Sequence, residues 1–168
     1  MTYRYEMMRH LSFVEAKNLV LVNQVGGATD IVYDGTSGAF NNRGELVLMM
    51  KQFEEDFQIF DTKAQNPPVG IPSTYNDRTR MVYQAARCGL RDFFVKNGYK
   101  KACIGLSGGI DSAVVACLAA DALGRQNIRA LLLPSQFSSD HSVEDAKKLA
   151  ENLGIEYNVI PITEIYTS

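Results

Sequence analysis

Small and polar residues follow one another in the segment 107–112, which has the sequence Ser-Gly-Gly-Ile-Asp-Ser. The apolar run 102–106 precedes it and predicts a buried strand, and a helical pattern begins near Asp111. Glycines let a backbone approach a ligand closely, and the first N–H groups of a helix have no partner within the helix. This order therefore predicts a cradle for a phosphate or pyrophosphate, because the helix start carries a partial positive charge.

Two side chains of this segment extend the chemistry that it could perform. The carboxylate of Asp111 is a ligand that Mg²⁺ accepts, and the hydroxyl of Ser112 can bond to a phosphate oxygen. The same residues also fit an ordinary turn in which Asp111 or Ser112 caps the helix. The segment lacks the Lys-Ser/Thr pair of a Walker loop and the third glycine of a dinucleotide-binding fingerprint, so it is neither of these.

The second half of the chain alternates between extended and helical patterns. The expected order is strand 101–106, helix 111–123, strand 128–133, helix 142–153 and strand 156–160. This alternation predicts a parallel sheet with right-handed crossovers, in which ligands bind at the carboxyl ends of the strands. The loops 107–112 and 134–141 would then face one ligand. Ser142 and Asp145 resemble a capping box at the start of the second helix.

The first half has a different pattern. We expect helix 1–18, strand 19–22 ended by 23–27, strand 31–33, a hairpin of 38–40 and 45–50 around the turn 41–44, and strand 57–60. Residues 61–77 hold three of the five prolines and show no periodicity, which predicts an interdomain linker or an arm on the surface. Apolar residues return at helical spacing over 78–96, and Gly98 would end that helix.

Bulk properties exclude several classes of protein. The 168 residues suffice for one domain or for pieces of two, and the formal charge of −2 without charged blocks does not indicate nucleic-acid binding. No apolar segment approaches the ~20 residues that cross a membrane, and the N-terminus does not resemble a signal peptide. The three cysteines match no zinc pattern and fit a reducing cytoplasm, and we expect Cys103 and Cys117 to be core residues.

The full string SGGIDSA after an apolar strand resembles the pyrophosphate loop of the N-type ATP pyrophosphatases, which split ATP between the α and β phosphates and adenylate a substrate. The strings GYKKACIGLSGGIDSAVVACLAADALG and LLLPSQFSSDHSVEDAKKLAENLGI are similar to NAD synthetases, especially the glutamine-dependent kind. Independently, LVLVNQVGGATDIVYDGTSGAFNNRGELVLMMKQFEEDFQIFD resembles the carboxyl-terminal end of a nitrilase-type glutaminase, the domain that precedes the synthetase in that family.

This resemblance implies an α/β chain that joins two partial domains. The C-terminal end of a nitrilase-type αββα sandwich would occupy 1–62, a linker 63–77, and the first half of a parallel-sheet, Rossmann-like pyrophosphatase domain 78–168. The Glu–Lys–Cys set of the glutaminase would lie outside this chain, since 1–62 hold no cysteine. We therefore expect an internal fragment that is inactive alone, with sheet faces that lack covering helices.

The resemblance also implies a ligase reaction. With ATP and Mg²⁺ as cofactors, the full enzyme would adenylate the carboxylate of deamido-NAD, and ammonia from glutamine would displace AMP to give NAD. It implies a homo-oligomer for the full-length protein and no nucleic-acid or membrane partner. The nucleotide-binding residues that it implies are Gly105, Leu106, Ser107, Gly108, Gly109, Ile110, Asp111 and Ser112 at the phosphate end and Leu133, Pro134 and Ser135 at the adenosine, with Asp111 as the metal ligand.

Residues 136–142 resemble the mobile loop that covers the site in this family. The alternative for Ser138, Ser139 and His141 is a solvated surface loop, and for His141 the two interpretations have about equal weight. Two alternatives to a NAD synthetase remain at this point. One is another N-type pyrophosphatase, such as a tRNA-thiolation enzyme, which would bring basic or zinc-binding RNA modules that this chain lacks. The other is a non-catalytic nucleotide-binding remnant that keeps the loop.

Overall fold

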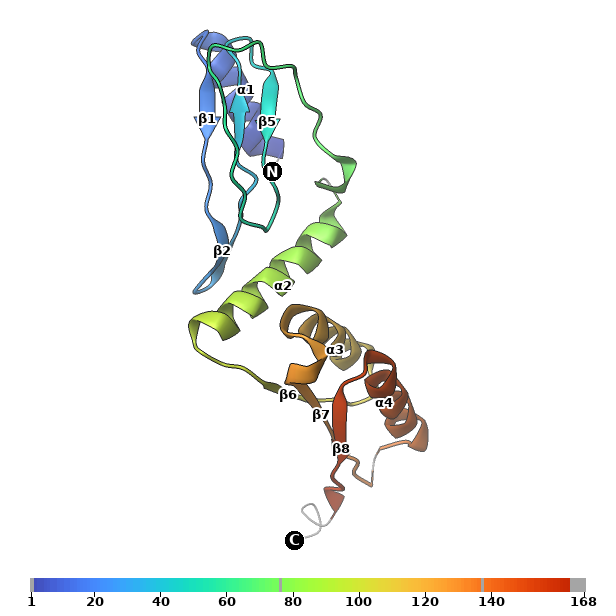
Figure 1. Ribbon diagram of the computed structural model, residues 1–168. Coiled ribbons are helices and arrows are strands. Elements are labelled where there is room, and N and C mark those ends of the chain that lie inside the picture. The colour runs from blue at the N-terminus through green and yellow to red at the C-terminus, as the bar shows by residue number, and fades with distance from the viewer. Residues whose placement is uncertain (1, 76, 137, 164–168) are drawn as a thin grey trace. The chain divides into compact units, whose positions relative to one another are not determined.

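The computed structural model describes residues 2–75, 77–136 and 138–163 (Figure 1). The chain forms two compact units, Met1–Gly89 and Leu90–Ser168. The division lies within the long helix α2 (Arg78–Lys96), downstream of the linker expected at 63–77. As expected from its apolar spacing, α2 covers 78–96, and Gly98 follows it with a φ of +72°.

The N-terminal unit is built from one helix and two small antiparallel sheets. Its elements are α1 (Thr2–Val14), β1 (Leu19–Leu21), β2 (Val25–Ala28), β3 (Ile31–Asp34), β4 (Gly38–Phe40) and β5 (Leu46–Met49), with sheets β1-β4-β5 and β2-β3. The hairpin expected around 41–44 is present as β4-β5. All three residues of the central strand β4 are buried, and Tyr5 of α1 packs edge-on against Phe40 with ring centroids 5.5 Å apart.

Two expectations for this unit are wrong. Val25–Ala28 form β2, although the Asn-Gln-Val-Gly-Gly stretch was expected only to end β1. Antiparallel pairing with β3 across Thr29, whose φ is +54°, makes a tight hairpin that overrides the weak strand preference of glycine. Conversely, no strand forms at 57–60, where Phe57 and Ile59 are each 83% exposed, because no neighbouring strand pairs with this stretch in the described part of the chain.

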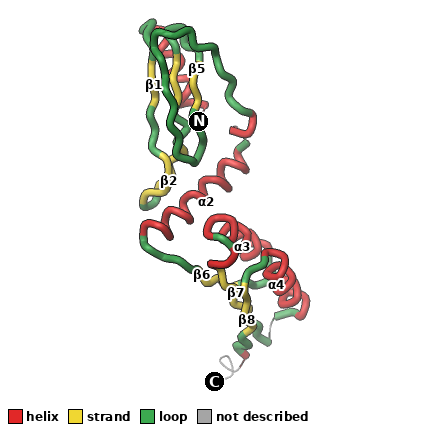
Figure 2. The backbone as a smooth tube through the Cα atoms, viewed as in Figure 1, coloured by secondary structure: helices red, strands yellow, loops and turns green. Residues whose placement is uncertain are grey.

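The segment 63–77 is mostly loop, with one short 3₁₀ turn, η1 (Ser73–Tyr75) (Figure 2). It is tied to the N-terminal unit, because the backbone N–H of Val69 donates to the carbonyl oxygen of Leu46 in β5 at 2.7 Å. Pro68, Val69 and Ile71 also line a cavity of about 300 Å³ together with Tyr5 and other residues. These contacts fit an arm on the surface for 68–71, and the interdomain linker at 63–77 stays a prediction.

The C-terminal unit is the alternating arrangement that the sequence predicts. Its elements are β6 (Ala102–Gly105), α3 (Ile110–Leu123), η2 (Arg125–Asn127), β7 (Ile128–Leu132), α4 (Asp140–Leu153) and β8 (Glu156–Val159). The three strands pair in parallel in the order β6-β7-β8. Gly124 and Gly154, with φ of +85° and +65°, follow the two helices at the expected positions.

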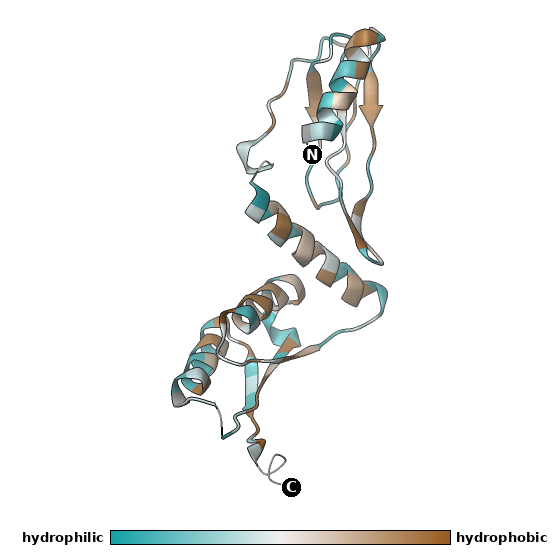
Figure 3. Cartoon of the chain, turned by 180° about the vertical axis from the view of Figure 1, so that it is seen from behind, coloured by the Kyte–Doolittle hydropathy of each residue, from teal (hydrophilic) through white to brown (hydrophobic). Residues whose placement is uncertain are grey.

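One face of this sheet packs on α3 and α4. Alternate strand residues such as Ile104, Ala130 and Leu132 join a core with Ala116 of α3 and Ala150 of α4. The small helix residues let the helix backbones approach the sheet closely. Helix α3 is nevertheless apolar around much of its circumference, and its Ile110, Val114 and Val115 remain 76%, 55% and 51% exposed (Figure 3).

The opposite face of the sheet is open in the described part of the chain. Cys103, Arg129 and Glu156 lie in one row across the three strands, and all three are exposed. A hydrogen bond from Arg129 holds the pKa of Glu156 below its usual value. The expectation that Cys103 is a core residue is therefore wrong, because strand side chains alternate between faces and Cys103 points away from the helices. Cys117 on α3 is half-buried.

Within the described ranges, none of the helices combines the length and the apolar character that crossing a membrane requires.

Candidate functional site

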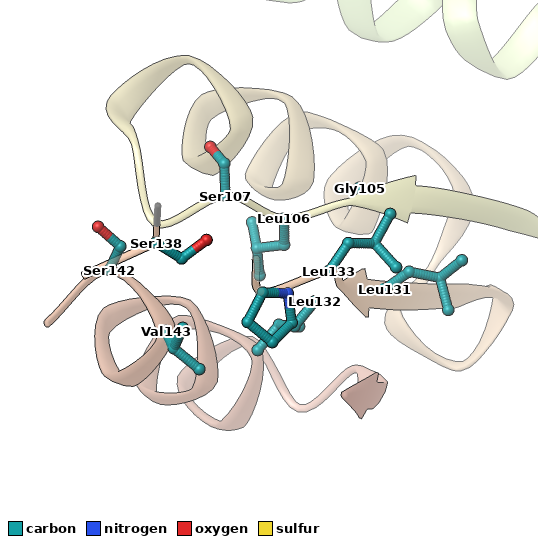
Figure 4. A pocket seen from close by; sticks show the side chains of 10 residues that line it. Gly105, Leu106, Ser107, Leu131, Leu132, Leu133, Ser138, Ser142 and Val143 are labelled. Atoms are coloured by element: carbon teal, nitrogen blue, oxygen red, sulfur yellow. The ribbon is translucent and has the colours of Figure 1, made fainter. Parts of the chain in front are cut away.

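A cavity of about 280 Å³ lies where β6 and β7 end (Figure 4). Its lining residues are Gly105, Leu106, Ser107, Leu131, Leu132, Leu133, Pro134, Ser138, Ser142 and Val143. The structure thus brings the loop after β6 and the loop after β7 to one cavity, as expected for the carboxyl edge of a parallel sheet. Five of the sequence-predicted residues line it: Gly105, Leu106, Ser107, Leu133 and Pro134.

The cavity has an apolar side and a hydroxyl-bearing side. Figure 4 shows the side chains of Leu131 and Leu133 on one side and those of Ser107, Ser138 and Ser142 on the other. A small-molecule site typically combines apolar walls with a few convergent polar groups. The arrangement therefore suits a ligand with an apolar ring at one end and hydrogen-bond acceptors at the other.

The Ser-Gly-Gly loop holds its shape through its own polar atoms. The Oγ atom of Ser112 accepts from the backbone N–H of Ser107 at 3.2 Å and lies 3.0 Å from the Oγ atom of Ser107. The same hydroxyl lies 3.0 Å from the carbonyl oxygen of Gly109, to which it donates. The N–H of Gly109 donates back to the Oγ atom of Ser107 at 3.3 Å. Ser112 is therefore a brace of the loop as well as a candidate phosphate ligand.

The start of α3 lacks a side-chain cap. Its N-cap residue is Gly109, in an extended conformation with φ −84° and ψ 158°, and the cap makes no side-chain hydrogen bond. The simple turn, in which Asp111 or Ser112 caps the helix, is thus wrong. Without a cap, the positive end of α3 is available to an anion. Asp111 lies in this first turn and is exposed.

Gly108 is the position of the loop where only glycine fits. Its φ is +79°, and a Cβ atom there would lie 2.2 Å from the carbonyl oxygen of Ser142 in α4. By contrast, a Cβ at Gly109 would meet only the Oγ atom of Ser107 at 3.4 Å, and one at Gly105 would meet nothing within 4 Å. The requirement at Gly108 therefore comes from the protein's own backbone before any ligand is considered.

The expected capping box of α4 is wrong. The N-cap is Ser139, whose Oγ atom accepts from the N–H of Ser142 at 3.2 Å, so Ser142 lies within the first turn. In the loop before it, the N–H of Ser135 donates to the Oγ atom of Ser138 at 3.0 Å. Of the expected covering loop 136–142, residue 137 lies outside the described residues, and His141 is exposed.

Several predicted residues border the cavity in sequence without lining it. These are Gly108, Gly109, Ile110, Asp111, Ser112 and Ser135. Sequence reasoning missed Leu131, Leu132 and Val143, which do line it. Leu131 and Leu132 are the last residues of β7, and their place beside the loop could have been inferred from the parallel register alone.

Metal binding at this site would depend on Asp111. Among residues 2–75, 77–136 and 138–163, no group of three His, Cys, Asp or Glu side chains is placed to hold a metal ion. A lone carboxylate beside a phosphate cradle still fits Mg²⁺, which usually keeps several waters and binds one or two carboxylates together with substrate phosphates.

Comparisons with known proteins find relatives over most of this chain. A family model described as NAD synthase matches residues 82–168, which include both loops of the cavity. The glutamine-dependent NAD(+) synthetase of Aquifex aeolicus is 42% identical over 86% of this chain, and that of Acinetobacter baylyi is 33% identical over 99%. This chain spans 31% of the length of each of these curated relatives.

Solved structures give the same result. The glutamine-dependent NAD+ synthetase of Acinetobacter baumannii, in complex with ADP, is similar with a TM-score of 0.86 and 32% identity, covering 99% of this chain and 32% of that one. The glutamine-dependent NAD(+) synthetase of Cytophaga hutchinsonii, at 18% identity and a TM-score of 0.77, shows the shared fold, covering 99% of this chain and 34% of that one. From the family match over more than half of its residues, we conclude that this chain belongs to the NAD synthase family.

Proposed function

We propose that this chain forms part of a glutamine-dependent NAD synthetase that makes NAD from deamido-NAD. The observation that carries the proposal is the cavity at the ends of β6 and β7, which combines apolar walls with the Ser107 hydroxyl just before the uncapped start of α3, within the region matched by the NAD synthase model. The names of the relatives from Aquifex aeolicus and Acinetobacter baylyi support the glutamine-dependent kind.

We assign the two sides of the cavity to two parts of ATP. Leu133, Pro134 and the adjacent Ser135 would border the adenosine, because the apolar side of the cavity lies there. Gly105 and Leu106 would lie near the nucleotide at the end of β6. The segment 107–112, including Ile110, would surround the phosphates with backbone N–H groups. The ADP in the solved relative from Acinetobacter baumannii supports an adenine nucleotide as the ligand.

Negative charge develops on the leaving pyrophosphate during the proposed reaction, and the site has groups that can stabilise it. A carboxylate oxygen of deamido-NAD attacks the α-phosphorus of ATP, and pyrophosphate leaves with the bonding electron pair. Fixed N–H dipoles of the loop and of α3 stabilise the charge that develops on the leaving group. Mg²⁺ held by Asp111 would neutralise part of that charge. Ammonia then attacks the activated carbonyl carbon, loses a proton, and displaces AMP to leave the amide of NAD.

The ammonia would come from chemistry outside this chain. We assign 1–62 to the end of a nitrilase-type glutaminase domain, 63–77 to the linker and 78–168 to the start of the synthetase domain. The family match from residue 82 supports these bounds, as does the lack of helices and strands other than η1 in 63–75 and at 77. We further propose a cytoplasmic homo-oligomer, with magnesium as the metal. The three cysteines, which match no zinc pattern, fit the cytoplasmic assignment.

A test of this function measures NAD formation by the full-length protein that contains this chain. With deamido-NAD, ATP and Mg²⁺ present, we expect NAD with either glutamine or ammonia as the nitrogen donor, and one AMP and one pyrophosphate for each NAD. Binding of ATP without NAD formation from either donor would instead support a non-catalytic remnant.

A further inference from the structure

The N-terminal turn of α4 packs directly against the phosphate loop. The carbonyl oxygen of Ser142 occupies the space that a side chain at Gly108 would need, at 2.2 Å from the position of its Cβ, and the Cα atom of Ser142 is 2.9 Å from that position. Ser142 also lines the cavity. A short shift of the Ser142 backbone would therefore change both the position of the loop and the shape of the cavity.

Ser139 is the residue that fixes Ser142. Its Oγ atom accepts from the backbone N–H of Ser142 at 3.2 Å and lies 2.8 Å from the Oγ atom of Ser142, and its carbonyl oxygen accepts from the same N–H at 3.1 Å. Ser139 itself has an extended backbone, with φ −74° and ψ 149°, as an N-cap residue should. The other side-chain hydrogen bonds that the structure shows for the loop in the described residues run among Ser107, Gly109 and Ser112.

Besides its continuation into α3, whose Ala116 and Ala119 lie in the core, the loop has an anchor at its start and another at its middle. At its start, the N–H of Leu106 donates to the carbonyl oxygen of Leu131 at 2.9 Å and ties the loop to the sheet. At its middle, Gly108 rests on Ser142. The first anchor is part of a sheet that the apolar core stabilises. The second depends on the capped first turn of α4.

We propose that Ser139 is a positioning residue for the phosphates of the nucleotide, acting through Ser142 and Gly108. By capping α4, it sets the distance between the phosphate loop and the apolar side of the cavity. This inference rests on the proposed function, because the ligand that it positions is the ATP of that reaction. Ser139 lies outside the loop that carries the phosphate-binding assignment.

The test uses three variants of the full-length protein. Ser139→Ala should raise the KM for ATP roughly fivefold, the factor that loss of one N-cap typically represents, while the KM for glutamine stays unchanged. Ser139→Asn should restore the KM for ATP, because asparagine is an equally good N-cap. Asp145→Asn, at an exposed position on the same helix, is the control and should leave both constants unchanged.

A role in general stability would not give this pattern, because it would not separate ATP from glutamine. An unchanged KM for ATP in Ser139→Ala overturns the inference, and so does failure of the asparagine rescue in a variant with the wild-type melting temperature. If the wild-type protein forms no NAD, the proposed function fails instead.

Hydrogen–deuterium exchange of the wild-type protein decides the question if Ser139→Ala does not fold. Added ATP should slow the exchange of the Ser142 and Val143 amides roughly fivefold or more, because an occupied phosphate loop holds Gly108 against the helix turn. Exchange at these two amides that ATP leaves unchanged overturns the inference.

Discussion

The segments 34–38 and 107–112 are built from almost the same residue types, yet the structure uses them in opposite ways. The first is Asp-Gly-Thr-Ser-Gly in the N-terminal unit, and the second is Ser-Gly-Gly-Ile-Asp-Ser in the C-terminal unit. In the first, Thr36 and Ser37 are 0% and 7% exposed. In the second, Ser107, Gly109 and Asp111 are exposed.

The two aspartates show the contrast most directly. Both carboxylate oxygens of Asp34 accept hydrogen bonds from Arg4, at 3.0 to 3.1 Å, and one of them also accepts from Asn23 at 2.9 Å. Asp111 lies exposed at the first turn of an uncapped helix. The polar groups of 34–38 are satisfied by distant parts of the fold, which indicates a structural role. In the described residues, the side-chain hydrogen bonds of 107–112 run within the segment, which lies next to a cavity and is a candidate ligand site.

The substitution Asp111→Asn should have the largest effect of those we consider. Losing the carboxylate that would hold Mg²⁺ near the leaving pyrophosphate should lower NAD synthesis by about 10² to 10³ fold. Glutamine hydrolysis should survive in part, because we assign its chemistry to residues outside this chain. Steady-state rates of both reactions, measured on one preparation of the full-length protein, check this.

The same variant should leave stability within about 0.5 kcal/mol of wild type, since an exposed residue without structural partners contributes little. Normal NAD formation by Asp111→Asn would remove the metal role from this residue. A large loss of stability in Asp111→Asn would show that Asp111, like Asp34, has a structural role.

The substitution Asp34→Ala should have the complementary effect. It leaves the Arg4 guanidinium, whose side chain is 29% exposed, without its carboxylate, and we expect a loss of about 2 kcal/mol, between the values for exposed and buried pairs. Amide exchange at Gly35 and Thr36 should then be about thirtyfold faster, because 1.4 kcal/mol corresponds to a factor of ten. Unchanged exchange at these amides would show that the hydrogen bonds of Asp34 do not order the segment 34–38.

The substitution Tyr5→Phe should have the smallest of these effects, a change in how stability depends on pH at high pH. The Tyr5 hydroxyl donates to the carbonyl oxygen of Thr36 at 3.0 Å, and burial raises its pKa from 10.0 to about 12. Between pH 10 and about 12, Tyr5 keeps its proton in the folded protein but loses it in the unfolded chain. The contribution of protonated Tyr5 to folding stability is therefore fully present below pH 10 and is lost as the pH rises to about 12. Urea midpoints measured across this range should fall less steeply in Tyr5→Phe than in wild type. Parallel slopes for the two proteins would contradict a buried, protonated Tyr5.

The elements of the C-terminal unit could be predicted from the sequence because each has its own periodicity and stop signal. Gly124 and Gly154 mark the ends of α3 and α4 as expected. The N-terminal unit was harder because its strands are short and depend on partners. β2 contains two glycines and forms only by pairing with β3, whereas the strand-like pattern at 57–60 finds no partner in the described residues.

In the site too, features that depend on short sequence motifs could be predicted, and contacts between distant residues could not. The Ser-Gly-Gly loop and the loop after β7 are local motifs, and sequence reasoning placed both at one cavity. The contact of Gly108 with Ser142 joins residues 34 positions apart and has no local signal. The N-cap of α4 is Ser139 and not Ser142, because the chain changes from extended to helical after Ser139. Several serines and aspartates stand next to one another here, so the sequence does not show which of them is the cap.

The three thiols of the chain differ in exposure: Cys103 is exposed on β6, Cys117 is half-buried on α3, and Cys88 is buried on α2. A small thiol-reactive dye should therefore label Cys103 in the native protein. It should label Cys117 and Cys88 fully only when α3 or α2 separates from the residues packed against it. The order of labelling under increasing denaturant would record which of these elements opens first, without any substitution in the chain.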